Sequence, residues 1–125
     1  MFNKELVVQI LGKIEFAIER ILSGSPEIAS PQHYLSSPSG MERLESNCLL
    51  LMAIGESVKG IDKITHGKLF ILYPDIDWKG VMGMRDIIAH HYFDIDAETV
   101  YDVVKNELST LKETVSQIKK DYLSI

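Results

Sequence analysis

Apolar residues recur at three- and four-residue spacings over the first part of the chain, which is the spacing of one face of an α-helix. The pattern starts near Asn3 and stops at the Ser-Gly-Ser-Pro segment that begins at Ser23. Its apolar positions are Leu6, Val7, Ile10, Leu11, Ile14, Ala17, Ile18, Ile21 and Leu22. The pattern predicts an amphipathic first helix with one face toward solvent.

Residues 23–40 interrupt this periodicity. They contain Pro26, Pro31 and Pro38 together with several serines and two glycines. Proline and glycine clusters are typical of connecting segments, so we expect a loop with a short turn around residues 32–35.

A second helix is predicted from Met41 to Ile64, and its middle is apolar on every side. The segment CLLLMAI, residues 48–54, has no polar position for nearly two turns and includes the only cysteine, Cys48. A helix with this pattern is buried all round. We expect either a central helix wrapped by the others or a helix that also faces a second subunit.

The second half of the chain predicts two more helices. Asp77 is a good N-cap for a third helix from Trp78 to His90, and Asp96 is one for a final long helix. That last helix has apolar positions at Val100, Val103, Val104, Leu108, Leu111, Val115, Ile118 and Tyr122. The fold class expected is all-α, an up-down bundle of four to five helices that forms one domain over residues 1–125.

Composition narrows the function classes. A formal charge of −5 and a pI near 5.3 give no general attraction for nucleic-acid phosphates, so any such contact must be local. One cysteine excludes an internal disulfide and a cysteine-based zinc site, which suits a reducing cytoplasm. No apolar run approaches the length of a membrane span. A chain of 125 residues buries a limited share of its surface, so a homodimer is plausible.

The segment GMRDIIAHHYFDID, residues 83–96, concentrates ionisable groups where the pattern asks for core. On a continuous helix Asp86 and His90 share a face, so the carboxylate would orient the imidazole. Arg85 lies about 140° away from His90 on such a helix. The two meet only if the helix ends near Ala89 to His90, or if two copies of the helix meet across a two-fold axis.

An arginine beside a histidine suits metal-free cleavage of RNA. Histidine can take and give a proton near neutral pH, and a guanidinium stabilises charge that grows on phosphate oxygens. The competing interpretation of Arg85, Asp86 and His90 is a capping and salt-bridge network without catalysis. His91, by helical spacing, points elsewhere, and we expect a surface or backbone-bonded histidine in preference to a second catalytic group.

Glu56 is the other polar residue of interest, because it follows an apolar stretch. A buried carboxylate needs a partner, so we expect Glu56 to pair with Arg85 and to position it. No histidine or cysteine lies at metal-ligand spacing and no glycine-rich phosphate loop is present, so no metal or cofactor is expected.

The order Arg85, four residues, His90, one residue, Tyr92 is an R-x-x-x-x-H-x-Y motif. With the surrounding YPDIDWKGVMGMRDIIAHHYFDID, the IGESVKG segment at 54–60 and DIDAETVYDVV at 94–104, it resembles HepT-type proteins of the HEPN superfamily. The resemblance covers roughly residues 41–120. The position after the arginine is often asparagine in that family, whereas this chain has Asp86.

This resemblance implies a homodimeric helical bundle that is the toxin of a toxin–antitoxin pair and cuts RNA without a metal. Arg85 and His90 would be catalytic, with Asp86 as a supporting residue. The implied partner is a minimal nucleotidyltransferase antitoxin that silences the toxin by transferring AMP to Tyr92. The alternative is a non-catalytic dimeric module that binds, and is modified by, such a transferase.

Overall fold

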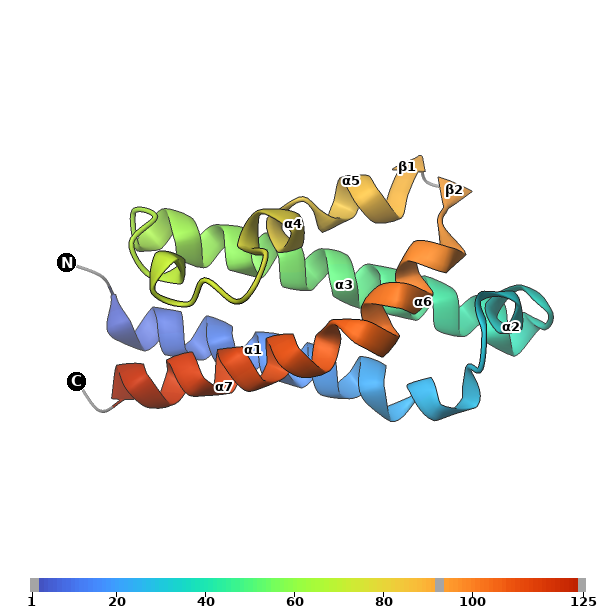
Figure 1. Ribbon diagram of the computed structural model, residues 1–125, viewed down its shortest axis with the longest axis horizontal. Coiled ribbons are helices and arrows are strands. Elements are labelled where there is room, and N and C mark those ends of the chain that lie inside the picture. Colours follow the sequence, from blue (N-terminus) through green and yellow to red (C-terminus); the bar gives the residue numbers. More distant parts are fainter. Residues whose placement is uncertain (1–2, 92–93, 124–125) are drawn as a thin grey trace.

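The protein is a bundle of antiparallel helices (Figure 1). The computed structural model describes residues 3–91 and 94–123; within these ranges it leaves out the side chains of Ser25, Ile87, Ala89, His90, His91 and Asp94. The helices are α1 (Lys4–Ser23), α2 (Pro31–Leu35), α3 (Pro38–Ile64), α4 (Trp78–Met82), α5 (Met84–Ile88), α6 (Ala97–Asn106) and α7 (Leu108–Leu123), with 3₁₀ turns η1 (Ser25–Glu27) and η2 (Phe70–Leu72). The predicted all-α class is confirmed.

The path of the chain gives an up-down arrangement. In Figure 1, α1 and the pair α4 and α5 run one way along the bundle, and α3 and the pair α6 and α7 run back. Both ends of the chain lie at the same end of the bundle, and α2 lies at the other. In the described part of the chain, no helix is both long enough and apolar enough to cross a membrane.

Helix starts follow the capping residues. The Asn3 side chain accepts a hydrogen bond from the Leu6 N–H at 3.1 Å, so α1 begins where predicted. The helix predicted from Met41 begins three residues earlier, because the Ser37 hydroxyl accepts from the Gly40 N–H at 3.0 Å. Pro38, with no N–H to lose, is suited to the first helical position.

The prediction of one helix from Trp78 to His90 is wrong. Helix α4 ends at Met82 and is capped by Gly83, whose N–H donates to the Lys79 carbonyl at 3.0 Å, and α5 ends at Ile88. The chain then forms the short strand β1 (Ala89–His91), which pairs antiparallel with β2 (Asp94–Ile95). The Ile88 carbonyl accepts from the Asp96 N–H at 2.8 Å, a bond made by the returning strand end instead of by a helix.

The predicted final helix is divided as well. Asp96 caps α6 by accepting from the Thr99 N–H at 3.1 Å, as predicted. Helix α6 ends at Asn106, and α7 begins at Leu108 after Glu107. The two helices nevertheless continue the same apolar series, since Val100, Val104, Leu108, Leu111, Val115 and Ile118 are all buried.

The core forms between α1, α3 and the pair α6 and α7. In the apolar CLLLMAI segment, Cys48, Leu51 and Ile54 are buried, whereas Leu49 is 70% exposed. The interpretation of α3 as a helix wrapped on every side is therefore wrong within one subunit. That a second subunit covers its open face stays a prediction.

Candidate functional site

A glycine on α3 sets the position of the segment that carries the candidate site. A Cβ on the buried Gly55 would lie 2.7 Å from the Val81 carbonyl oxygen and 3.6 Å from Met84 Cβ. Only a residue without a side chain lets the backbone of α4 approach α3 this closely. The sequence held a signal for this contact, because a glycine inside a helix destabilises it relative to alanine.

Helix α5 rests on the bundle through its apolar residues and turns its charged residues outward. Met84 and Ile88 are buried, and between them Arg85 and Asp86 are exposed. Among the side chains that the structure describes, neither Arg85 nor Asp86 forms an ion pair. An exposed guanidinium with no carboxylate partner is available to an anionic ligand.

His90 does not share a helix with Asp86. Helix α5 ends at Ile88, and His90 lies in β1, so the argument that a four-residue helical spacing places Asp86 against His90 does not hold. The helix end near Ala89 is one of the two arrangements expected to bring His90 toward Arg85. The roles of Arg85, Asp86 and His90 stay predictions, as does the surface position of the His91 side chain. Tyr92 lies outside the described residues.

The expectation for Glu56 is wrong. Its side chain is 60% exposed, and its carboxylate lies 3.7 Å from Lys59 Nζ one turn along α3. No ion pair joins Glu56 to Arg85 where the structure describes both. The residue therefore belongs to a solvated pair on the helix surface, which carries little free energy.

Other chemistry-bearing side chains offer few alternatives. Cys48 is buried, and burial raises the pKa of its thiol to about 11, so the nucleophilic thiolate is scarce near neutral pH. Among the side chains that the structure describes, no three from His, Cys, Asp and Glu are grouped closely enough to hold a metal ion.

Comparisons with known proteins agree with the motif. The sequence model of the family described as "Ribonuclease HepT-like" matches residues 38–118, which include α3, the α4–α5 segment and both strands. No solved structure matches the chain significantly.

Three relatives have provisional ribonuclease names. A protein of Methanocaldococcus jannaschii named as an RNase is 37% identical over 71 residues, 57% of this chain and 55% of its own length. A HepT-named ribonuclease of Thermococcus cleftensis is 31% identical over 56% of this chain and 60% of its own length. An RNase-named protein of Caldanaerobacter subterraneus is 28% identical over 87% of both chains.

The matched segments span a little over half the length of the first archaeal relatives. The match to the family, in contrast, includes about two thirds of this chain and every residue of the R-x-x-x-x-H-x-Y motif. The chain belongs to the HepT-like ribonuclease family.

Proposed function

We propose that this protein is a metal-independent endoribonuclease in which Arg85 and His90 carry the reaction. The observation that carries the proposal is the position of Arg85: its guanidinium is exposed and has no ion pair among the described side chains, and it lies in the first turn of the short helix that directly precedes the strand containing His90. This segment lies inside the region that matches the family. The ribonuclease names of the relatives support the same reaction class.

The proposed step uses the RNA itself as the nucleophile. His90 accepts the proton of a 2′-hydroxyl, the 2′-oxygen forms a bond to the adjacent phosphorus, and the bond from phosphorus to the 5′-oxygen breaks. The 5′-oxygen leaves with a proton taken from solvent or from the imidazolium. Arg85 donates hydrogen bonds to the phosphate oxygens on which negative charge grows. The products are a 2′,3′-cyclic phosphate and a 5′-hydroxyl.

The proposal includes control by a partner. A nucleotidyltransferase antitoxin would transfer AMP from ATP to the Tyr92 hydroxyl, with release of pyrophosphate. Tyr92 follows Arg85 by seven positions in the sequence. The attached AMP phosphate would add negative charge and bulk near the proposed site and would compete with an RNA phosphate for Arg85. A homodimer would let each cleft draw residues from both subunits.

The first test is RNA cleavage in the presence of EDTA. Unmodified protein should cut RNA to products with cyclic phosphate ends, and His90→Ala should lower the rate about 10²- to 10⁴-fold while the unfolding curve stays the same. Glu56→Gln is a matched control, because it also changes one ionisable residue of the HepT-like region.

A second test joins the protein to its partner. Incubation with ATP and a nucleotidyltransferase encoded beside it should add the mass of AMP at Tyr92 and stop cleavage. Failure of the unmodified protein to cut any RNA, while it still dimerises and accepts AMP, would favour the non-catalytic module instead.

A further inference from the structure

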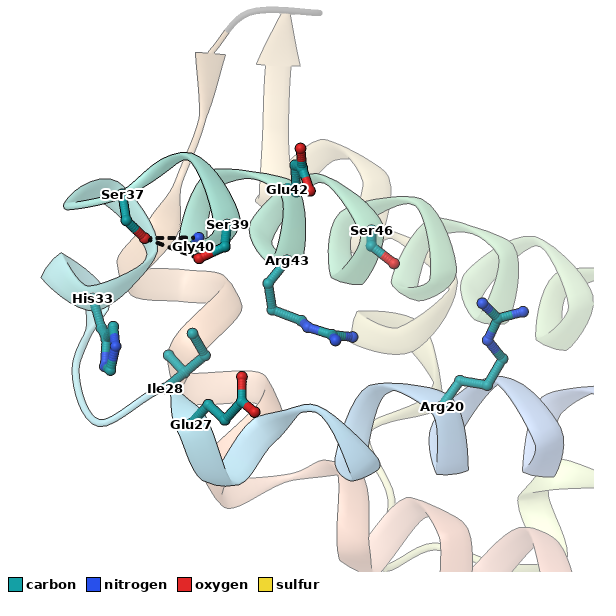
Figure 2. A pocket seen from close by; sticks show the side chains of 10 residues that line it. All are labelled: Arg20, Glu27, Ile28, His33, Ser37, Ser39, Gly40, Glu42, Arg43 and Ser46. Carbon is teal, nitrogen blue, oxygen red and sulfur yellow. Dashed lines mark hydrogen bonds between the residues drawn. The ribbon is translucent and has the colours of Figure 1, made fainter.

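A cavity of about 430 Å³ opens between the C-terminal part of α1 and the N-terminal part of α3. Figure 2 shows its lining, which comes from α1, η1, α2, α3 and the connections between them. Among the side chains that the structure describes, none from α4, α5, β1 or β2 lines it, and Arg85 is not part of the lining. Arginine, histidine and serine side chains dominate its polar lining.

Arg43 is a half-buried cation without a counter-ion among the described side chains. Its guanidinium packs so tightly on Gly24 that a Cβ at this glycine would collide with the guanidinium carbon. The C-terminal end of α1 offers it partial negative charge. Within the described residues, however, Arg43 forms no ion pair and no side-chain hydrogen bond. Partial burial of a charge is unfavourable unless a partner compensates it.

A second arginine points into the same space. In Figure 2 the guanidinium groups of Arg20 and Arg43 both extend into the space between α1 and α3, near Ser46. Arg20 is exposed, and its guanidinium carbon lies 5.9 Å from the centre of the Phe16 ring. Such a contact holds an arginine in place and leaves its N–H groups free to donate.

Two carboxylates also line the cavity, but neither neutralises the arginines. The Glu42 side chain points away from the guanidinium groups in Figure 2, whereas Glu27 points toward Arg43. Among the described side chains, neither carboxylate forms an ion pair with Arg20 or Arg43. Glu27 should therefore lower the affinity of the cavity for an anion without excluding the anion.

A backbone hydrogen bond orients the His33 ring, which also lines the cavity. Its Nδ1 accepts a hydrogen bond from the Ala29 N–H at 3.1 Å, so the proton of the neutral ring lies on Nε2. In Figure 2 the His33 ring lies on the far side of Ile28 from the two guanidinium groups, so the donors that share one space are Arg20, Arg43 and the nearby Ser46 hydroxyl. Guanidinium groups and a hydroxyl suit the oxygens of a phosphate group.

We propose that this cavity binds a phosphate group, with Arg43 and Arg20 as its principal donors. The phosphate would belong either to an RNA backbone or to a free nucleotide, since both present the same oxygens. The proposal does not depend on cleavage, because binding can be measured without it and Arg85 does not line the cavity.

Binding, rather than cleavage, tests the proposal. Calorimetric titrations of the full chain would use inorganic phosphate, AMP and a 2′-O-methylated oligoribonucleotide, which lacks the attacking hydroxyl. Arg20→Gln and Arg43→Gln should each weaken binding about tenfold or more, the loss expected for charge-assisted hydrogen bonds. Lys63→Gln removes the same charge from an exposed position at the far end of α3 and should change affinity less than about twofold.

The two carboxylates give a test of opposite sign. Glu27→Gln should strengthen binding, and Glu42→Gln, which makes the same charge change on a side chain that points away, should change it less. These variants and Arg20→Gln keep the test decisive if Arg43→Gln unfolds the protein.

Comparison of the phosphate, AMP and oligonucleotide titrations distinguishes a free nucleotide from an RNA backbone as the source of the bound phosphate. A dependence on Arg20 in the AMP and phosphate titrations supports a free nucleotide, and a dependence confined to the oligonucleotide supports the RNA backbone. If every ligand binds Arg20→Gln and Lys63→Gln alike, or if none binds the wild-type protein, the proposal is overturned. Each result holds whether or not the protein cuts RNA.

Discussion

Charged residues are paired in the contact between α1 and α7, but among the described side chains they are not paired with each other on the α4–α5 segment. Between α1 and α7, the Glu15 carboxylate accepts hydrogen bonds from Lys119 and Ser116. On the same face the Glu19 carboxylate lies 3.3 Å from Lys112 Nζ. On α5, where the structure describes both side chains, Arg85 and Asp86 face solvent without an ion pair.

This difference distinguishes a region that stabilises the fold, the α1–α7 contact, from the region that carries the candidate site, helix α5. Paired charges hold α1 and α7 together and fix which surfaces meet, so their contribution is to the folded state. An unpaired guanidinium on a short helix adds little to folding, but it is available when an anion arrives. The comparison predicts that changes to α5 affect activity without stability, and that changes to the α1–α7 contact do the reverse.

The largest expected effect is on catalysis. Arg85→Ala should lower the rate of RNA cleavage about 10²- to 10³-fold, because the charge that grows on the phosphate loses a preorganised donor. The free energy of unfolding, from urea titration, should change by less than about 0.5 kcal/mol, as is usual for a surface substitution. Arg85→Lys should restore part of the rate. Full activity of the alanine variant would remove Arg85 from the proposed mechanism.

The next largest effect is expected from a change at the contact between α3 and α4. Gly55→Ala should destabilise the protein by about 1–3 kcal/mol, because the added Cβ would lie 2.7 Å from the Val81 carbonyl and the core would be overpacked. Gly60→Ala on the same helix is the matched control. A Cβ there meets no atom within 4 Å, and alanine favours a helix by about 0.5–1 kcal/mol over glycine. Equal effects of the two variants would show that the close approach is unimportant.

A smaller effect, with a pH signature, is expected between α1 and α7. Burial tends to raise the pKa of Glu15, but the hydrogen bonds from Lys119 and Ser116, together with the positive charges of Lys119 and Lys112, outweigh it, and the net shift is downward. The stabilisation is therefore present above the ordinary carboxyl pKa and is lost as pH falls through the lowered value.

Two variants measure this stabilisation. Glu15→Gln should cost about 1 kcal/mol at pH 7, with solvent screening taken into account, and less in acid. Glu19→Gln breaks a more exposed pair and should cost at most about 0.5 kcal/mol. Urea titrations at pH 7 and at pH 3 give the comparison, and a Glu15→Gln penalty that persisted unchanged at pH 3 would contradict the ionic origin.

The smallest expected effect is at Glu56. Glu56→Gln should leave both the cleavage rate and, within about 0.5 kcal/mol, the free energy of unfolding unchanged, because its partner Lys59 is an exposed neighbour on the same helix. A loss of tenfold or more in the cleavage rate would show that Glu56 supports the candidate site after all. The same assays as for Arg85 provide the measurement.

Local signals predicted much of the fold. Asn3, Asp77 and Asp96 each cap the helix that was predicted to follow them, because capping depends on a few consecutive residues. The family resemblance is also confirmed, since the match covers the quoted motif.

The breaks around the site could not be predicted in the same way. The end of α5 at Ile88 coincides with a hydrogen bond from the Asp96 backbone, which reaches this carbonyl only after the chain has turned back through β1 and β2. The exposure of Glu56 was misjudged for a related reason. The residues that precede it are apolar, but the elements that pack on α3 cover the adjacent Gly55 and leave Glu56 in solvent.

The five-residue length of α5 has a consequence for amide hydrogen exchange. A helix this short has room for only about one internal bond from an N–H to the carbonyl four residues earlier, so its amides should exchange far sooner than those in the middle of α3. Exchange at Arg85 and Asp86 would then slow when a ligand settles on the segment. Deuterium uptake by this single turn would report occupancy of the site even in a variant that has lost all catalysis.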